Sequence, residues 1–168
     1  CLSVLSKIDY PRDRFEIIVI DNGSSDDTLL IAEKYADKIF LYPDVNVGAV
    51  RNFGVKKSDH DLLFFLDSDC VVEKEWMISG VRRLMDSSNT VFGGNLYIRE
   101  QANWLEKYWF LENRNKPSIQ KDLLGSCIFI KKEDFLSVGG FREDITSGED
   151  TNISQKLKEK GFNVIIDA

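Results

Sequence analysis

The sequence predicts an α/β protein in which a mostly parallel, Rossmann-like sheet is flanked by helices. Strand-like and helix-like segments alternate along the chain, which favours βαβ units. Residues 62–66 are an uninterrupted apolar run, typical of a central strand that is buried on both faces. This run and the strand-like residues 15–20 each stop at a carboxylate, Asp67 and Asp21. Ligands of open α/β sheets bind at the carboxyl ends of strands, so we expect a functional site there.

The first half of the chain is predicted from apolar runs and turn signals. Residues 15–20 form a strand, and the polar turn at 22–25 offers an N-cap to a helix that reaches about residue 36. Residues 39–42 form a short strand that Pro43 ends, and residues 46–57 are a loop that enters a helix.

The second half continues this alternation. We expect helices at residues 73–85, 132–138 and 149–160, and strands at 90–98, 123–130 and 163–166. Gly125 interrupts the strand at 123–130, Thr146 or Ser147 is the expected N-cap of the last helix, and Gly161 ends that helix. Residues 103–113 are rich in aromatic side chains.

Composition limits the possible functions. A chain of 168 residues forms one domain, and a net charge of −6 with a pI near 4.9 argues against nucleic-acid binding. The three cysteines are far apart, so neither a zinc site nor a disulfide framework is indicated, which fits a reducing cytosol. No apolar run has the length of a membrane span. The chain opens without Met in what resembles the end of a helix and closes on a strand, so we expect a fragment truncated at both ends.

Asp67-Ser68-Asp69 is the first candidate site. Two carboxylates at a strand end suit Mg²⁺ or Mn²⁺, which they can share with the phosphates of a substrate. The alternative is a solvated turn after the strand. A net negative chain that binds an anionic substrate needs such a cation or a few well-placed basic residues.

Four further patterns are candidates for a site, and each has a structural alternative. Asp21 with Asn22 either points into the same crevice as Asp67, because both carboxylates end a buried strand, or only caps a turn. Gly48 allows close approach, and Arg51 and Asn52 either reach a phosphate or base or are solvated. Gly125-Ser126 indicates close packing of a ligand or of backbone, whereas Glu149-Asp150 either complements a helix dipole or supplies a general base.

In combination these residues resemble family 2 glycosyltransferases, inverting nucleotide-sugar enzymes with a GT-A fold. The resemblance covers residue 15 to the C-terminus, and its four ordered landmarks are the segments 15–28, 46–52, 66–69, and 138–141 followed by 148–150. Family members usually open with a strand and loop that help hold the base. That strand would lie beside residues 15–20, and this chain lacks it.

The resemblance implies a role for each candidate residue. Asp21, Asn22, Gly48, Arg51 and Asp67 would hold the nucleotide of a UDP- or GDP-sugar, and Asp69 with Asp67 would bind Mg²⁺ or Mn²⁺ at the diphosphate. Asp150 would deprotonate the acceptor hydroxyl, Glu149 would support the acceptor side, and Gly125 and Ser126 would line the sugar side. The acceptor would be a glycan, polysaccharide or lipid-linked sugar of the cell envelope. The enzyme would work in the cytoplasm, on the inner face of the membrane where the full-length protein has an anchor.

Two other functions fit parts of the sequence. Residues 63–72 also resemble the first motif of haloacid-dehalogenase-type phosphatases, although that motif usually stands near the start of the chain. A non-catalytic sugar-nucleotide-binding module is the other alternative, and the joint presence of Asp67, Asp69 and Asp150 argues against it.

Overall fold

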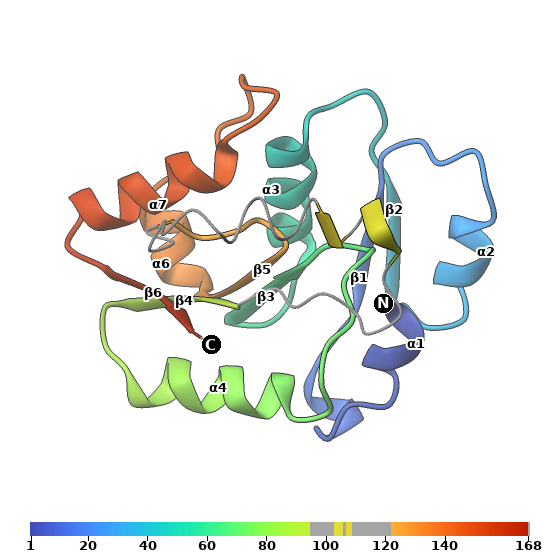
Figure 1. Ribbon diagram of the computed structural model, residues 1–168, viewed down its shortest axis with the longest axis horizontal. Coiled ribbons are helices and arrows are strands. Elements are labelled where there is room, and N and C mark those ends of the chain that lie inside the picture. The colour runs from blue at the N-terminus through green and yellow to red at the C-terminus, as the bar shows by residue number, and fades with distance from the viewer. Residues whose placement is uncertain (95–102, 106, 109–121, 168) are drawn as a thin grey trace.

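The computed structural model describes residues 1–94, 103–105, 107–108 and 122–167 (Figure 1). The helices are α1 (Leu2–Leu5), the 3₁₀ helix η1 (Arg12–Arg14), α2 (Thr28–Ala32), α3 (Val47–Lys57), α4 (Trp76–Asp86), α6 (Lys132–Ser137) and α7 (Glu149–Glu159). The strands are β1 (Ile18–Asp21), β2 (Lys38–Leu41), β3 (Leu62–Leu66), β4 (Thr90–Gly94), β5 (Cys127–Lys131) and β6 (Asn163–Asp167).

The described strands form two sheets. β1 and β2 pair in parallel, and the second sheet has the order β3-β5-β4-β6. β5 is antiparallel to both of its neighbours, whereas β4 and β6 are parallel. Within the second sheet β5 is therefore the one reversed strand, and because it lies between β3 and β4, two of the three pairings are antiparallel. In the second sheet β3, β4 and β6 run in one direction, as a mostly parallel sheet requires. The prediction is wrong for β5, because both of its pairings are antiparallel.

β1 and β3 run in the same direction, although they belong to different sheets. Asn22 follows β1 and donates its side-chain N–H to the carbonyl of Val45, just before α3. Asp67 follows β3 and pairs with Arg51 in the first half of α3. The carboxyl ends of both strands therefore lie near the start of α3.

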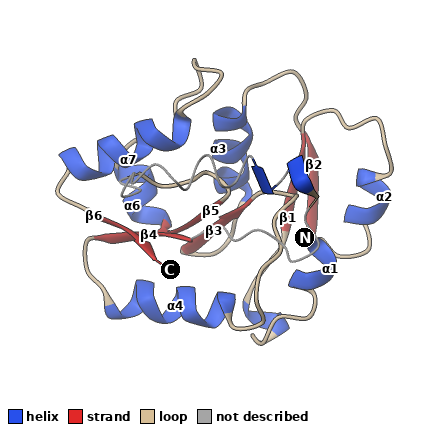
Figure 2. Cartoon of the chain, in the orientation of Figure 1, coloured by secondary structure: helices blue, strands red, loops and turns tan. Residues whose placement is uncertain are grey.

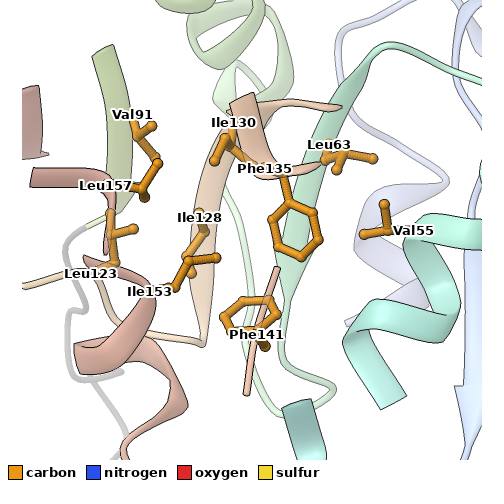
Figure 3. Close-up of a cluster of buried hydrophobic side chains, with 10 residues drawn as sticks. All are labelled: Val55, Leu63, Val91, Leu123, Ile128, Ile130, Phe135, Phe141, Ile153 and Leu157. Atoms are coloured by element: carbon orange, nitrogen blue, oxygen red, sulfur yellow. The ribbon is translucent and has the colours of Figure 1, made fainter. Parts of the chain in front are cut away.

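Helices cover both faces of the four-stranded sheet. α6 and α7 lie on one face and α4 lies on the other (Figure 2). On the first face, Val55 of α3 joins the main core, which is the cluster of buried side chains shown in Figure 3. On the α4 face, Leu84 packs with Phe92, Cys127 and Phe129. Among the described residues, no helix is long and apolar enough to cross a lipid bilayer.

Several predicted boundaries differ from the structure. The helix expected to reach residue 36 is the short α2, which ends at Ala32. The predicted strand at 123–130 begins only at Cys127, because Gly125 and Ser126 are in the turn that precedes β5. The strand predicted over 90–98 is observed to Gly94, and its remainder lies outside the described residues.

Candidate functional site

Asp67 and Asp69 lie directly beyond β3. The Asp67 N–H donates to the carbonyl of Ser126 at 3.2 Å, which continues the antiparallel ladder by one residue and fixes the start of the loop. The Asp67 side chain is 43% exposed, and Asp69 is exposed. Both predicted carboxylates are therefore open to solvent at the edge of the sheet.

Arg51 joins this strand end to the start of α7. Its guanidinium pairs with Asp67 Oδ1 through Nη2 at 2.9 Å and with Glu149 Oε1 through Nη1 at 2.6 Å. Its Cζ also lies 5.5 Å from the centre of the Phe141 ring. The side chains of Arg51 and Glu149 are only 11% and 10% exposed, so this pair is largely removed from water.

Gly125 explains how Arg51 fits. A Cβ on Gly125 would lie 2.6 Å from both terminal nitrogens of Arg51, closer than real Cβ contacts allow. The sequence predicted a close approach at this glycine, and the approaching group is the Arg51 side chain. The neighbouring Ser126 hydroxyl is buried and has no hydrogen-bond partner among the described residues.

Asp150 and Glu149 open α7 but have different surroundings. The Asp150 carboxylate accepts the N–H of Gly125 through Oδ2 at 3.2 Å, and it remains partly exposed. Glu149 is buried in the ion pair with Arg51, and its role on the acceptor side stays a prediction. The N-cap is Gly148 at φ +79°, not Thr146 or Ser147.

The start of α3 packs against the loop before α7. Asn46 caps α3 by accepting the N–H of Ala49 at 2.9 Å, and it donates to the carbonyl of Glu143. Asn52 is buried and bonds to both backbone groups of Phe141 and to Glu143 Oε1. The sequence suggested that Asn52 reaches a phosphate or base. Its partners in the structure are instead protein groups.

Gly48 also faces protein. A Cβ at this position would collide with the carbonyl of Arg142, so glycine is needed for the packing of α3 on the loop before α7. Sequence reasoning missed Glu143 and the role of Phe141, since no local signal marks a loop residue whose partners are about 90 positions away.

Asp21 is almost fully buried at the end of β1. Its Oδ1 accepts the N–H groups of Gly23 and Ser24, each at 2.9 Å. Hydrogen bonds from Ser24, followed by the one from Gly23, hold the pKa of Asp21 below its usual range despite burial. Asn22 bridges to Val45. Both residues therefore shape the loop that follows β1, and Asn22 ties this loop to the residues just before α3.

The donor atoms suit a hard divalent cation. Among the described residues, no three or more His, Cys, Asp or Glu side chains gather as a metal cluster, so the two predicted carboxylates, Asp67 and Asp69, have no third such side chain beside them there. Burial, together with Asp69 and Asp67, raises the pKa of the adjacent Cys70 thiol to about 11, which keeps it neutral at pH 7. Two carboxylates without a thiolate fit Mg²⁺ or Mn²⁺ that completes its coordination with phosphate oxygens.

The aromatic segment is only partly described. Trp104 and Tyr108 are 77% and 58% exposed, so neither is core. Trp109 and Phe110, which belong to the same predicted segment, lie outside the described residues.

Comparison with known proteins identifies relatives along the whole chain. The family model "Glycosyl transferase family 2" matches residues 1–138. Glycosyltransferase AglE of Haloferax volcanii is 29% identical over 98% of this chain and 58% of its own length. Chondroitin synthase of Pasteurella multocida is 31% identical over 98% of this chain and 22% of its own length. The chain thus spans less than two thirds of the length of each of these relatives.

Solved structures share the fold at lower identity. Mannosyltransferase PcManGT of Pyrobaculum calidifontis, in complex with GDP-Man and Mn²⁺, has a TM-score of 0.76 and 20% identity over 99% of this chain and 49% of its own. S. aureus TarS 1-349 in complex with UDP-GlcNAc has a TM-score of 0.75 and 19% identity over 99% of this chain and 50% of its own.

Proposed function

Because the chain belongs to glycosyl transferase family 2, we propose that it is the core of an enzyme that transfers a sugar from a nucleoside diphosphate to a hydroxyl acceptor. The observation that carries the proposal is the convergence of Asp67, Asp69 and Asp150 at one edge of the sheet. Arg51 pairs with Asp67 and with Glu149 in the first turn of α7. Asp150, in the same turn, accepts the N–H of Gly125, which lies against the Arg51 side chain.

The donor would lie at the carboxyl ends of β1 and β3. Asp67 and Asp69 would hold Mg²⁺ or Mn²⁺, and this cation would offset the charge that develops on the leaving diphosphate. The loop after Asp21, which Asn22 ties to the start of α3, would contact the base and ribose. Solved relatives bind UDP-GlcNAc and GDP-Man, which supports a UDP- or GDP-sugar as the donor.

Asp150 would be the general base. It is partly exposed, and its Oδ2 is oriented by the Gly125 N–H. It would take the proton of the acceptor hydroxyl while that oxygen bonds to the anomeric carbon. The bond from that carbon to the phosphate oxygen breaks with its electron pair leaving on the diphosphate, and the configuration inverts.

Glu149 and Arg51 would position this base and would not react. Their ion pair fixes the first turn of α7 relative to Asp67, so the base and the metal-binding carboxylates keep one spacing. The exposed Trp104 would stack on a sugar of the acceptor, since an aromatic face suits the apolar side of a sugar ring.

The family match removes the phosphatase alternative, and an assay separates the enzyme from a non-catalytic module. The full-length protein is incubated with UDP- and GDP-sugars, Mn²⁺ and a panel of glycan acceptors, and nucleoside diphosphate release is measured. We expect release that Asp150→Ala lowers by about 10²- to 10⁴-fold, the range of general-base catalysis. Asp144→Ala is the matched control, since Asp144 is exposed on the preceding loop.

The stereochemical part of the proposal has its own readout. The anomeric proton coupling of the product, measured by NMR, gives its configuration. An α-linked donor is expected to give a β-linked product. A product that retains the donor configuration would contradict direct attack by a hydroxyl that Asp150 has deprotonated.

A further inference from the structure

Three side chains at intervals of four residues along α7 hold the segment that leads to β5. They are Asp150, Ser154 and Lys158, and this spacing places them on one face of the helix. Each bonds to a residue in the segment 122–125. The segment therefore runs along α7, and its end nearest β5 lies at the carboxylate of the proposed base.

Ser154 forms the middle contact and is fully buried. Its hydroxyl accepts the N–H of Leu123 at 2.8 Å and donates to the carbonyl of Asp150 at 2.7 Å. Ser154 is 0% and Leu123 1% exposed, so without the hydroxyl the Leu123 N–H would have no solvent to bond to. A serine hydroxyl that donates to the carbonyl four residues earlier keeps its lone pairs for a donor outside the helix. Ser154 thus joins a buried backbone N–H of the segment to the first turn of α7.

These bonds close a ring that begins and ends on Asp150. From the Asp150 carbonyl the ring passes through the Ser154 hydroxyl to the N–H of Leu123. The backbone continues to Gly125, whose N–H returns to Asp150 Oδ2 at 3.2 Å. The other carboxylate oxygen, Oδ1, accepts the N–H of Thr151 at 2.7 Å. The ring fixes where the Gly125 N–H lies, and this N–H in turn orients the carboxylate.

The other contacts of the segment do not set this orientation. Lys158 pairs with Asp122 at 2.6 Å, but both side chains are 40% exposed, and exposed ion pairs contribute little. The Leu123 side chain belongs to the main core (Figure 3), where apolar packing is non-directional and does not orient the backbone N–H. The Ser154 hydroxyl supplies the buried, directional bond that fixes the start of the peptide leading to Gly125.

We propose that Ser154 is a positioning residue for the base: its hydroxyl holds the segment 123–125 so that the Gly125 N–H keeps the Asp150 carboxylate in one orientation. Because Asp150 is itself the proposed base, this role of Ser154 rests on the proposed function. Ser154 is fully buried, so it acts through Asp150 and touches no substrate. A misplacement of about 1 Å can lower a rate ~10²-fold, which makes such a bond matter for turnover.

Amide hydrogen exchange tests the positioning step without an activity assay. In Ser154→Ala of the full-length protein, the Leu123 N–H loses its acceptor directly. The informative amide is that of Gly125, because its own acceptor on Asp150 is unchanged. We expect it to exchange at least tenfold faster than in the wild type, while Ile130, near the other end of β5, keeps its rate. No change at Gly125, or equal acceleration of both amides, would overturn the proposal.

Steady-state kinetics separates positioning from general loosening. With the donor and acceptor found in the release assay, Ser154→Ala is expected to lower kcat at least tenfold. The donor KM should stay within twofold, since the donor would lie at Asp67 and Asp69. Ile130→Val is the control, because it removes a buried methyl group and lowers the unfolding midpoint without touching the ring. A wild-type kcat in Ser154→Ala, or an equal loss in Ile130→Val, would overturn the proposal.

The Asp150→Ala background distinguishes this inference from the proposed function. If Ser154 acts through Asp150, adding Ser154→Ala to Asp150→Ala should change kcat less than twofold. A further tenfold loss in the double variant would overturn the positioning role and leave the hydroxyl a structural one, with the function of Asp150 intact. Wild-type turnover by Asp150→Ala would overturn the proposed function, and the role of Ser154 with it.

Discussion

Arg51 and Glu149 are 98 positions apart in the sequence and form an ion pair of 2.6 Å that is largely shielded from water. Arg51 also pairs with Asp67, so one side chain connects the end of β3 with the helix that carries Asp150. This link makes the geometry of the candidate site depend on a contact that no local sequence pattern shows.

The Arg51–Glu149 pair predicts a stability effect. Arg51→Met leaves Glu149 buried without its partner, which is expected to lower the free energy of unfolding by about 3–5 kcal/mol in urea titrations. In Arg51→Met/Glu149→Met no buried charge is left unpaired, since the Asp67 side chain is 43% exposed, so the loss should be smaller than the sum of the single variants. Arg142→Met is the control, because its pair with Asp144 is exposed. Additive losses would contradict a coupled pair.

Gly125 predicts an activity effect through the same arginine. Gly125→Ala would place a Cβ 2.6 Å from the Arg51 guanidinium and so displace it from Glu149 and Asp67. We expect transfer to fall at least tenfold. Gly54→Ala is the control, since its Cβ would have only an ordinary 3.5 Å contact. Equal activity of the two variants would show that the position of Arg51 does not matter.

Asp69 is predicted to act in binding the cation and not in stability. It is exposed, so Asp69→Asn should leave the unfolding midpoint unchanged. Loss of one carboxylate should weaken Mn²⁺-dependent donor binding at least tenfold by calorimetry. Asp86→Asn, an exposed substitution at the end of α4, is the matched control. Unchanged Mn²⁺ dependence in Asp69→Asn would remove this residue from the site.

Asp21 predicts a pH dependence of stability. Its pKa is lower in the folded chain than in the unfolded chain, so between these values the unfolded state binds more protons and stability rises with pH. The contribution is present above about pH 4, near the ordinary Asp value, and is lost as the pH falls through the folded pKa. Asp21→Asn keeps an oxygen acceptor but not the charge. The stability gap between wild type and variant, measured by urea unfolding, should shrink below pH 4. A constant gap would contradict this.

The sequence predicted the elements that local patterns specify. The bounds of β3 agree with the apolar run at 62–66, because a carboxylate follows it directly. The glycine signals at Gly48 and Gly125 correctly indicated close packing, but sequence alone could not identify the neighbours, which come from distant segments. The family resemblance implied an acceptor-side role for Glu149, and only the fold shows its pairing with Arg51.

The split of the sheet is harder to read from sequence. Pairing between strands that are distant in the sequence decides that the described β1 and β2 form a sheet apart from β3, and no local pattern shows it. The reversed direction of β5 was also not predicted, because an apolar strand of five residues reads the same in either direction.

Donor binding tests the central claim most directly. UDP and GDP are titrated by calorimetry into the full-length protein, once with Mn²⁺ and once with excess EDTA. The account predicts that one of them binds with Mn²⁺ and binds at least tenfold more weakly in EDTA. Equal affinity in both conditions, or no binding of either nucleotide, would contradict a metal-bridged diphosphate at Asp67 and Asp69.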